Sequence, residues 1–209
     1  HLTTATSAST YYIGFNMLDL VIGGKSNSSR LLRQAISIAI DYDEYISIFT
    51  NGRGILAQGP IPPGIFGYQD GKLKYNKTIF KIKDGEVVKK NLDEAKKLLT
   101  MAGYDNGIDE KTGKPLILYF EATGAGADTY AFLNWLRKQF KKINIQLVTR
   151  VTDYNRFQEK MINGTGQIFQ WGWNADYPDP ENFLFLLYSK NGKVEFGGEN
   201  ASNYESRRF

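Results

Sequence analysis

The sequence predicts an α/β protein with a mixed or parallel sheet flanked by helices. In the second half of the chain, short apolar runs typical of strands alternate with segments of helical periodicity. A strand at 115–120, a helix at 128–142 and a strand at 145–151 follow one another directly. This order indicates a βαβ unit with parallel strands and a right-handed crossover. In such sheets, ligands bind beyond the carboxyl ends of the strands.

Composition narrows the possible functions. A chain of 209 residues with 42% apolar and 14% aromatic side chains can bury a sizeable core, as one large domain or two small ones. No run of about eighteen apolar residues is present, so no membrane span is expected. The net charge is only +4, and the basic residues are scattered among acidic ones. A nucleic-acid partner would require a clustered basic face and is therefore not expected.

The sequence also excludes several kinds of reactive site. It contains no cysteine, and its only histidine is His1. Thiolate nucleophiles, zinc–sulfur sites, Ser-His-Asp triads and multi-histidine metal sites are thereby ruled out, and neither a metal nor a cofactor is expected. Residues 1–10 lack the basic start and apolar core of a signal peptide, so we expect a removed signal or an internal fragment.

The first half begins with an expected strand at 11–16 and a helix at 30–40 whose apolar residues share one face. Asp43 is expected to cap a second, short helix that ends near Asn51-Gly52. The sequence GPIPPG at 59–64 cannot be helical and predicts a stiff, extended loop.

The middle of the chain is polar and rich in lysine. Residues 67–90 show little periodicity and predict a surface loop with at most a short strand. Asn91 and Glu94 have the spacing of a capping box, and they predict a helix that Gly103 ends.

The second half continues beyond the βαβ unit with one more helix and one more strand. Asp153 is expected to cap a helix that Gly164 ends. A third strand is expected at 167–173, and it leads directly into the most distinctive segment of the chain.

That segment, Trp171 to Phe183, reads WGWNADYPDPENF. Aromatic faces around a carboxylate suit a positively charged or zwitterionic small ligand. Asp179-Pro180-Glu181 has the pattern of a helix start, so Asp179 is interpreted as a cap. Asp176 precedes Pro178 and lies outside that helix. A ligand role and a turn role both remain open for Asp176.

The aromatic residues of the third strand divide in the same way. Phe169, Trp171 and Trp173 share one face of the strand, and such a stripe is usually core. We assign Phe169 and Trp171 to the core. Trp173, at the end of the strand, is placed on a pocket wall, with a core position as the alternative.

Two enzymatic alternatives come from the same residues. Gly124-Ala125-Gly126 follows a strand and opens a helix, as in a dinucleotide-binding turn, and Asp153 could imitate the ribose-binding acid. However, Thr129 replaces the third glycine and Asp128 would repel a phosphate, which favours an ordinary turn. Alternatively, the carboxylates at 176, 179 and 181 beside tryptophans could form a glycosidase pair.

Six segments carry a family resemblance. In order they are YYIGFNM at 11–17, LRQAISIAID at 32–41, NGRGILAQGPIPPGIFGY at 51–68, NLDEAKKLLTMAGYDNGID at 91–109, FQWGWNADYPDPENFL at 169–184, and NASNY at 200–204. With these segments the chain resembles the family 5 extracellular solute-binding proteins, the bacterial peptide-binding components of ABC importers. The likeness covers nearly the whole chain.

The resemblance implies a type II periplasmic-binding-protein fold. Family members are typically over twice as long and close two lobes on the ligand, so residues 1–209 would be a single lobe of the C-terminal type, with the first lobe absent. It further implies a periplasmic location, no catalysis, a small peptide as ligand, and an importer permease as partner. The protein would be a monomer, peripheral to the membrane through its transporter.

The resemblance also assigns a binding role. In the peptide binders, the aspartate of a Trp-x-x-Asp pattern pairs with the free amino group of the ligand, and this role falls on Asp176, with Trp173 and Asn174 beside it. Gln170 and Thr123 stand about where some relatives carry an arginine, which leaves the length and type of the ligand open. Relatives also bind nickel chelates, haem or sugars.

Overall fold

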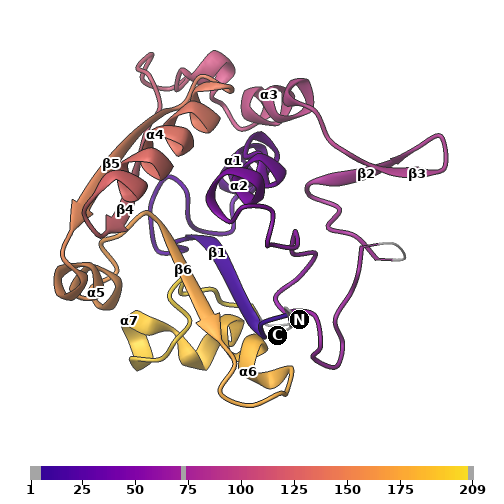
Figure 1. Cartoon of the computed structure of the whole chain (residues 1–209). Helices are drawn as coiled ribbons and strands as arrows, with labels where there is room; N and C mark the ends of the chain where they lie inside the picture. The colour runs from indigo at the N-terminus through magenta and orange to yellow at the C-terminus, as the bar shows by residue number, and fades with distance from the viewer. Residues whose placement is uncertain (1–5, 72–73, 207–209) are drawn as a thin grey trace.

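The computed structural model describes residues 6–71 and 74–206, with a four-stranded sheet in the order β1-β6-β4-β5 (Figure 1). The strands are β1 (Ser9–Phe15), β4 (Ile117–Thr123), β5 (Gln146–Thr152) and β6 (Ile168–Asn174). β4 is parallel to both β5 and β6, whereas β1 is antiparallel to β6. The α/β class and the mixed sheet are thus confirmed. His1 lies outside the described residues.

The βαβ unit is confirmed with a shifted first strand. Helix α4 (Ala127–Lys141) connects β4 to β5, and these two strands pair in parallel. The strand expected at 115–120 begins instead at Ile117 and continues to Thr123. Pro115 has no N–H to donate to a sheet ladder, and it forms only an isolated bridge with Ile108.

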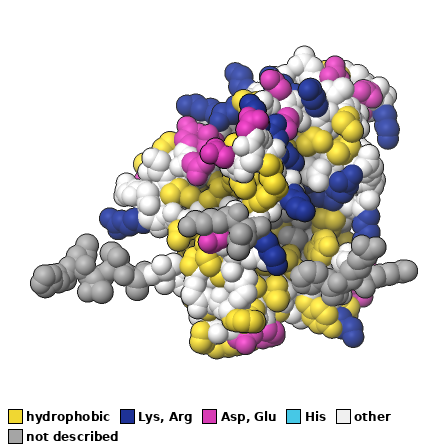
Figure 2. Space-filling model, turned by 90° about the vertical axis from the view of Figure 1, so that its right-hand side faces the viewer, with side chains coloured by type: hydrophobic (Ala, Val, Ile, Leu, Met, Phe, Trp, Pro, Cys, Tyr) yellow, Lys and Arg dark blue, Asp and Glu magenta, His cyan; other side chains and the backbone are white. Residues whose placement is uncertain are grey.

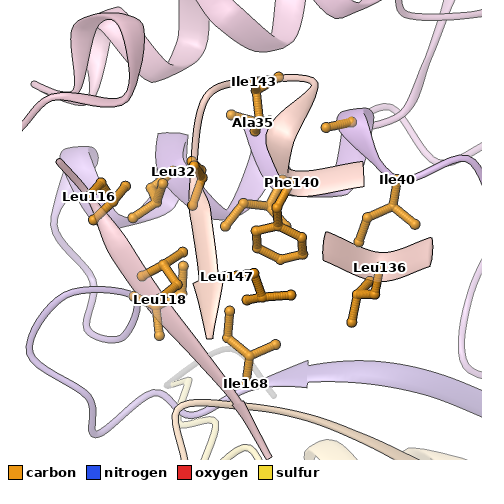
Figure 3. Close-up of a cluster of buried hydrophobic side chains, with 14 of the residues drawn as sticks. Leu32, Ala35, Ile40, Leu116, Leu118, Leu136, Phe140, Ile143, Leu147 and Ile168 are labelled. Atoms are coloured by element: carbon orange, nitrogen blue, oxygen red, sulfur yellow. The ribbon is translucent and has the colours of Figure 1, made fainter. Parts of the chain in front are cut away.

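The main core lies between the sheet and helices α1 (Asn27–Ala39) and α4 (Figure 3). The expected apolar face of α1 is buried, but the helix begins three residues before residue 30, because the Ser26 side chain accepts the N–H of Ser29. Helices and strands together contribute these buried side chains: Leu32, Ala35, Leu118, Leu136, Phe140, Leu147 and Ile168.

The opposite face of the sheet carries a second, smaller core against α5 (Tyr154–Ile162). Side chains alternate along β6, so Ile168 joins the main core and Phe169 joins the second. Gly14 lies opposite Phe169 in β1, and a Cβ there would approach the Phe169 ring to 2.4 Å. The ring of Trp171 packs 5.2 Å from that of Phe157. The core positions expected for Phe169 and Trp171 are confirmed.

The helix starts follow capping rules, with one correction. Asp153 accepts the N–H of Arg156 and caps α5 as expected. Helix α2 (Tyr42–Phe49), however, is capped by Asp41, whose carboxylate accepts the N–H of Glu44. The expected cap, Asp43, instead lies in the first turn of the helix, where an acid favours the helix dipole.

The lysine-rich region contains more structure than expected. It forms a hairpin of β2 (Phe80–Lys83) and β3 (Glu86–Lys89). Asp84 and Gly85 make the turn, both with positive φ, which is the conformation that Asp-Gly pairs favour in two-residue hairpins. The next helix, α3 (Leu92–Met101), has the expected capping box and is followed by Gly103 at φ 87°.

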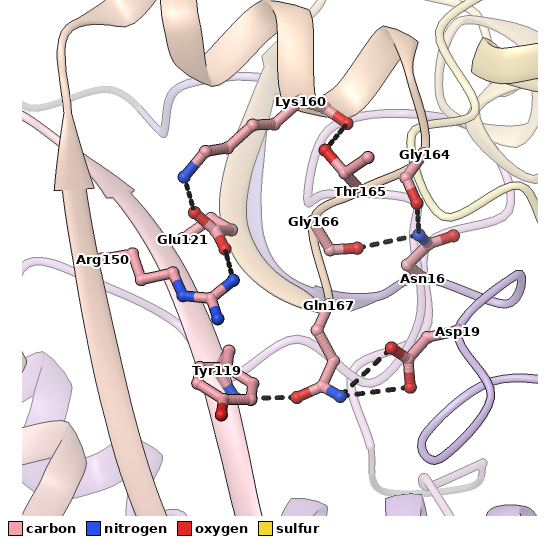
Figure 4. Close-up of polar contacts among 10 residues, drawn as sticks. All are labelled: Asn16, Asp19, Tyr119, Glu121, Arg150, Lys160, Gly164, Thr165, Gly166 and Gln167. Atoms are coloured by element: carbon pink, nitrogen blue, oxygen red, sulfur yellow. Dashed lines mark hydrogen bonds and ion pairs between the residues drawn. The ribbon is translucent and has the colours of Figure 1, made fainter.

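A buried carboxylate connects the sheet to α5. Glu121 of β4 is only 1% exposed and points to the face opposite the main core (Figure 4). There it forms ion pairs with Lys160 of α5 and Arg150 of β5. Two cations around one buried carboxylate compensate for its lost hydration.

The remaining elements are short. They are η1 (Asp105–Gly107), α6 (Glu181–Leu184), η2 (Phe185–Leu187), η3 (Ser189–Asn191) and α7 (Lys193–Phe196). None of the helices in the described part of the chain combines the length and the apolarity needed to cross a bilayer.

Candidate functional site

The distinctive segment leaves the sheet at the end of β6. Because β1 is antiparallel to β6, the start of β1 lies beside this end, with Ser9 opposite Asn174. The Ser9 hydroxyl donates to Asn174 Oδ1 over 2.8 Å, and the N–H of Ala175 donates to the carbonyl of Ala8. The side chain of Asn174 is thus exposed but already engaged with the neighbouring strand.

Asn182 of α6 organises the loop that follows. The residue is 3% exposed, and its Oδ1 accepts both the indole N–H of Trp173 and the backbone N–H of Asp176, over 3.0 and 2.9 Å. One buried oxygen therefore fixes the end of the strand and the backbone at residue 176. Sequence reasoning did not find this residue, since its partners lie nine and six positions away.

Asp176 is exposed and lies outside the helix, as expected. Its backbone is held by Asn182, while its carboxylate has no hydrogen bond or ion pair with any other described residue. An exposed, unpaired carboxylate on a fixed backbone is available to a cation from outside the chain.

The two neighbouring acids are engaged locally. Asp179 Oδ1 accepts the N–H of Glu181 over 2.8 Å, and the next backbone N–H groups bond to the carbonyls of Asp179 and Pro180. The helix thus starts one residue later than expected, because Pro180 is at the N-cap of α6 and Asp179 precedes it. Glu181 accepts a hydrogen bond from the Tyr177 hydroxyl, which raises the pKa of that tyrosine. Neither acid is arranged as a free partner for Asp176, so the glycosidase alternative is not favoured.

Trp173 is half-buried against the segment after α6. Its ring meets that of Phe185 edge-on, with centroids 5.0 Å apart, and its N–H is bound by Asn182. These contacts make Trp173 a support for the loop around Asp176. The pocket-wall position expected for Trp173 stays a prediction.

The glycine-rich loop forms a simple strand–helix connection. Gly124 and Gly126 both have positive φ, and α4 starts at Ala127 with no side-chain cap. Asp153, the alternative ribose-binding acid, is occupied by the N–H and the guanidinium of Arg156. Among residues 6–71 and 74–206, no group of three or more histidine, cysteine or acidic side chains is placed to hold a metal.

A cavity of about 240 Å³ opens at the carboxyl end of β4. Its lining comes from α2, β4, α4 and β6, namely Tyr45, Phe120, Glu121, Ala122, Thr123, Thr129, Phe132 and Gln170. Here Gln170 Nε2 donates to the Tyr45 hydroxyl oxygen over 3.3 Å. The structure thus brings Gln170 and Thr123 to one cavity, and adds Tyr45 and Thr129, which no local sequence signal indicated.

A second cavity, of about 440 Å³, lies between the end of α1 and the start of α3. Three lysines line it, but each contacts oxygens of the chain itself: Lys89 binds Asp41, Lys90 binds backbone carbonyls, and Lys142 binds Gln139. On the face shown in Figure 2, basic side chains are interspersed with acidic and apolar ones.

Comparison with known proteins places this geometry in a family. The profile of "Bacterial extracellular solute-binding proteins, family 5 Middle" matches residues 2–195. The oligopeptide-binding protein OppA of Bacillus subtilis is 26% identical over 179 residues, which are 85% of this chain and 30% of that protein. Heme-binding protein A of Haemophilus influenzae is also 26% identical, over 85% of this chain and 29% of its own length.

Solved structures show the same fold. The periplasmic binding protein DppA of Helicobacter pylori, in complex with the peptide STSA, matches 97% of this chain with a TM-score of 0.70 and 26% identity, and 34% of that chain is covered. AppA of Bacillus subtilis, in complex with a nonapeptide, gives a TM-score of 0.71 at 22% identity, with coverages of 97% and 37%. The chain spans about a third of the length of these relatives. It belongs to the family 5 bacterial extracellular solute-binding proteins.

Proposed function

We propose that this chain is one lobe of the substrate-binding component of a peptide-importing ABC transporter. Asp176 would bind the ligand's amino group, and Trp173 and Asn174 would form the adjacent wall. The component would work as a monomer in the periplasm, deliver its ligand to the membrane permease, and catalyse no reaction. Membership of the family and the peptide-binding relatives support this proposal.

One observation carries the proposal at the level of residues. The Asp176 carboxylate lies beyond the carboxyl end of β6, exposed and unpaired among the described residues, while Asn182 holds its backbone. A free α-amino group is a compact cation with three donors, and a carboxylate accepts such donors strongly.

Binding would then proceed by closure of two lobes around the peptide. Backbone hydrogen bonds would supply affinity that does not depend on sequence, and water-filled pockets would tolerate varied side chains. Because this chain would supply only one wall, it should bind far more weakly alone than within the longer protein.

Calorimetry tests the role of Asp176. We expect the full protein that contains this sequence to bind a pool of free-amine peptides, and Asp176→Ala to lower the affinity roughly ten- to a hundredfold, as expected for a lost charged hydrogen bond. Acetylation of the peptide amino group should have the same effect on the wild type and no further effect on the variant.

The matched control is Asp93→Asn, which removes an exposed aspartate from α3. It should leave affinity unchanged. Equal affinities of wild type and Asp176→Ala for free-amine peptides would refute the assignment of Asp176.

A further inference from the structure

The polar groups of the cavity at the carboxyl end of β4 carry no positive charge that could pair with a ligand carboxylate. Gln170 Nε2 donates to the Tyr45 oxygen, which leaves Gln170 Oε1 as an acceptor and the Tyr45 proton as a donor. The hydroxyl of Thr129 forms no hydrogen bond with another described residue. A ligand group that enters this cavity can therefore form hydrogen bonds with uncharged donors and with uncharged acceptors.

Within the part of the chain that the structure describes, no lysine, arginine or histidine lines the cavity. Glu121 belongs to the lining, but its buried carboxylate is on the other face of β4, bound by Lys160 and Arg150 (Figure 4). Those two cations are therefore engaged elsewhere. The apolar part of the wall, Phe120 and Phe132, further lowers the local polarity.

These facts discriminate between ligand groups. A carboxylate that enters such a cavity loses part of its hydration and finds no opposite charge among the described residues of this wall, which is costly. An amide loses less hydration and can pair with the acceptor of Gln170 and the hydroxyl donors. The same site would therefore bind an amide better than an acid.

We propose that the cavity lined by Tyr45, Thr123, Thr129 and Gln170 binds an uncharged amide of the peptide ligand and disfavours its free carboxylate. This inference rests on the proposed function, because it concerns the far end of the ligand that Asp176 holds. Gln170 and Asn174 are four residues apart on β6, or roughly 13 Å, and Asp176 follows two residues later. A ligand of about four to six extended residues spans this distance.

The amide has two possible sources, a carboxamide terminus or an inner peptide bond of a longer chain. Calorimetry of the full protein with three free-amine peptide pools distinguishes them. The pools are acids of about five residues, carboxamides of the same length, and acids of about nine residues. We expect the short carboxamides and the long acids to bind at least tenfold more tightly than the short acids.

Gln170→Arg supplies the missing cation and should reverse the order of the two short pools. Gln146→Arg, an exposed position at the start of β5, adds the same charge away from the cavity and should leave the order unchanged. Thr129→Val removes one hydroxyl with little change of shape. This variant tests the inference even if Gln170→Arg does not fold. It should reduce the difference in affinity between the short carboxamides and the short acids.

The outcomes separate the two proposals. Short acids that bind as tightly as carboxamides, with affinity still dependent on Asp176, would overturn the inference about the cavity and leave the peptide-binding function standing. Absence of binding by all three pools would instead reject the proposed function.

Discussion

At the scale of single residues, Asn182 connects two parts of the candidate site. Its buried oxygen receives two N–H groups, one from the indole of Trp173 and one from the backbone of Asp176. A carbonyl oxygen has two lone pairs, so both bonds can form together. The backbone that carries the exposed Asp176 carboxylate is thus held by a side chain that itself faces inward.

Asn182→Ala should lower the free energy of unfolding by about 1–3 kcal/mol, because it leaves the half-buried Trp173 N–H without an acceptor. The midpoint of urea unfolding, followed by circular dichroism, measures this loss. Peptide affinity should fall as well, since the loop at Asp176 loses its anchor.

Trp173→Phe provides the control for this change, because it removes the indole donor and keeps an aromatic ring against Phe185. In a double-mutant cycle, Asn182→Ala should cost less in the Trp173→Phe background than in the wild type. Strictly additive effects of the two substitutions would show that the hydrogen bond contributes nothing to stability.

At the scale of elements, Glu94 joins the β2–β3 hairpin to the start of α3. Its carboxylate accepts the N–H of Asn91 in the capping box and binds Lys81 Nζ of β2 over 2.8 Å. The hydrogen bond from Lys81 is the main cause that holds the pKa of Glu94 below its ordinary value of 4.5, and burial opposes it.

The lowered pKa predicts how stability depends on pH. A carboxylate whose pKa is lowered by folding stabilises the fold fully above its unfolded value of 4.5, and this contribution is lost as the pH falls through the folded pKa. Since the pair is partly exposed, the contribution should stay below about 1 kcal/mol.

Glu94→Gln keeps the size of the side chain and removes its charge. Urea midpoints should therefore be lower for the variant at about pH 7 and converge with the wild type near pH 3. Glu86→Gln, at an exposed position of β3, serves as the control for general charge effects. A difference between wild type and Glu94→Gln that stays constant over this range would contradict the assignment.

At the scale of the whole molecule, features that depend on local rules could be predicted from the sequence. The βαβ unit, the capping box at Asn91 and the cap at Asp153 all follow from residues close together in the chain, and α6 starts one residue after its expected place. The hairpin is harder to predict although Asp84-Gly85 is a turn signal, because each strand has only four residues and neither has a buried face.

The candidate site could be predicted only in part. Asp176 and Trp173 stand out in the sequence because they lie at the end of a recognisable strand, and their binding roles stay predictions. Asn182 was not found, since its role depends on how α6 folds back on β6. The β4 cavity needs Tyr45 from α2 beside Gln170, which is 125 positions away. Such contacts arise from tertiary packing and leave no periodic signal.

The sheet has two cores, one on each face, and strand β6 contributes to both. Ile168 lies in the main core and its neighbour Phe169 in the second. Adjacent residues of one strand cannot separate without loss of its pairing with β1 and β4. The two cores should therefore unfold together, as one cooperative unit.

The three tryptophans can report whether the two cores unfold together, because Trp135 packs in the main core while Trp171 and Trp173 lie on the other face. We expect fluorescence and far-ultraviolet circular dichroism to give the same urea midpoint in Trp135→Phe, which keeps the second-face reporters. The same agreement should hold in the double variant Trp171→Phe/Trp173→Phe, which keeps the main-core reporter. Comparison within each variant removes the effect of the substitution on overall stability. A fluorescence midpoint well below the dichroism midpoint in Trp135→Phe alone would mean that the layer carrying Asp176 opens independently of the main core.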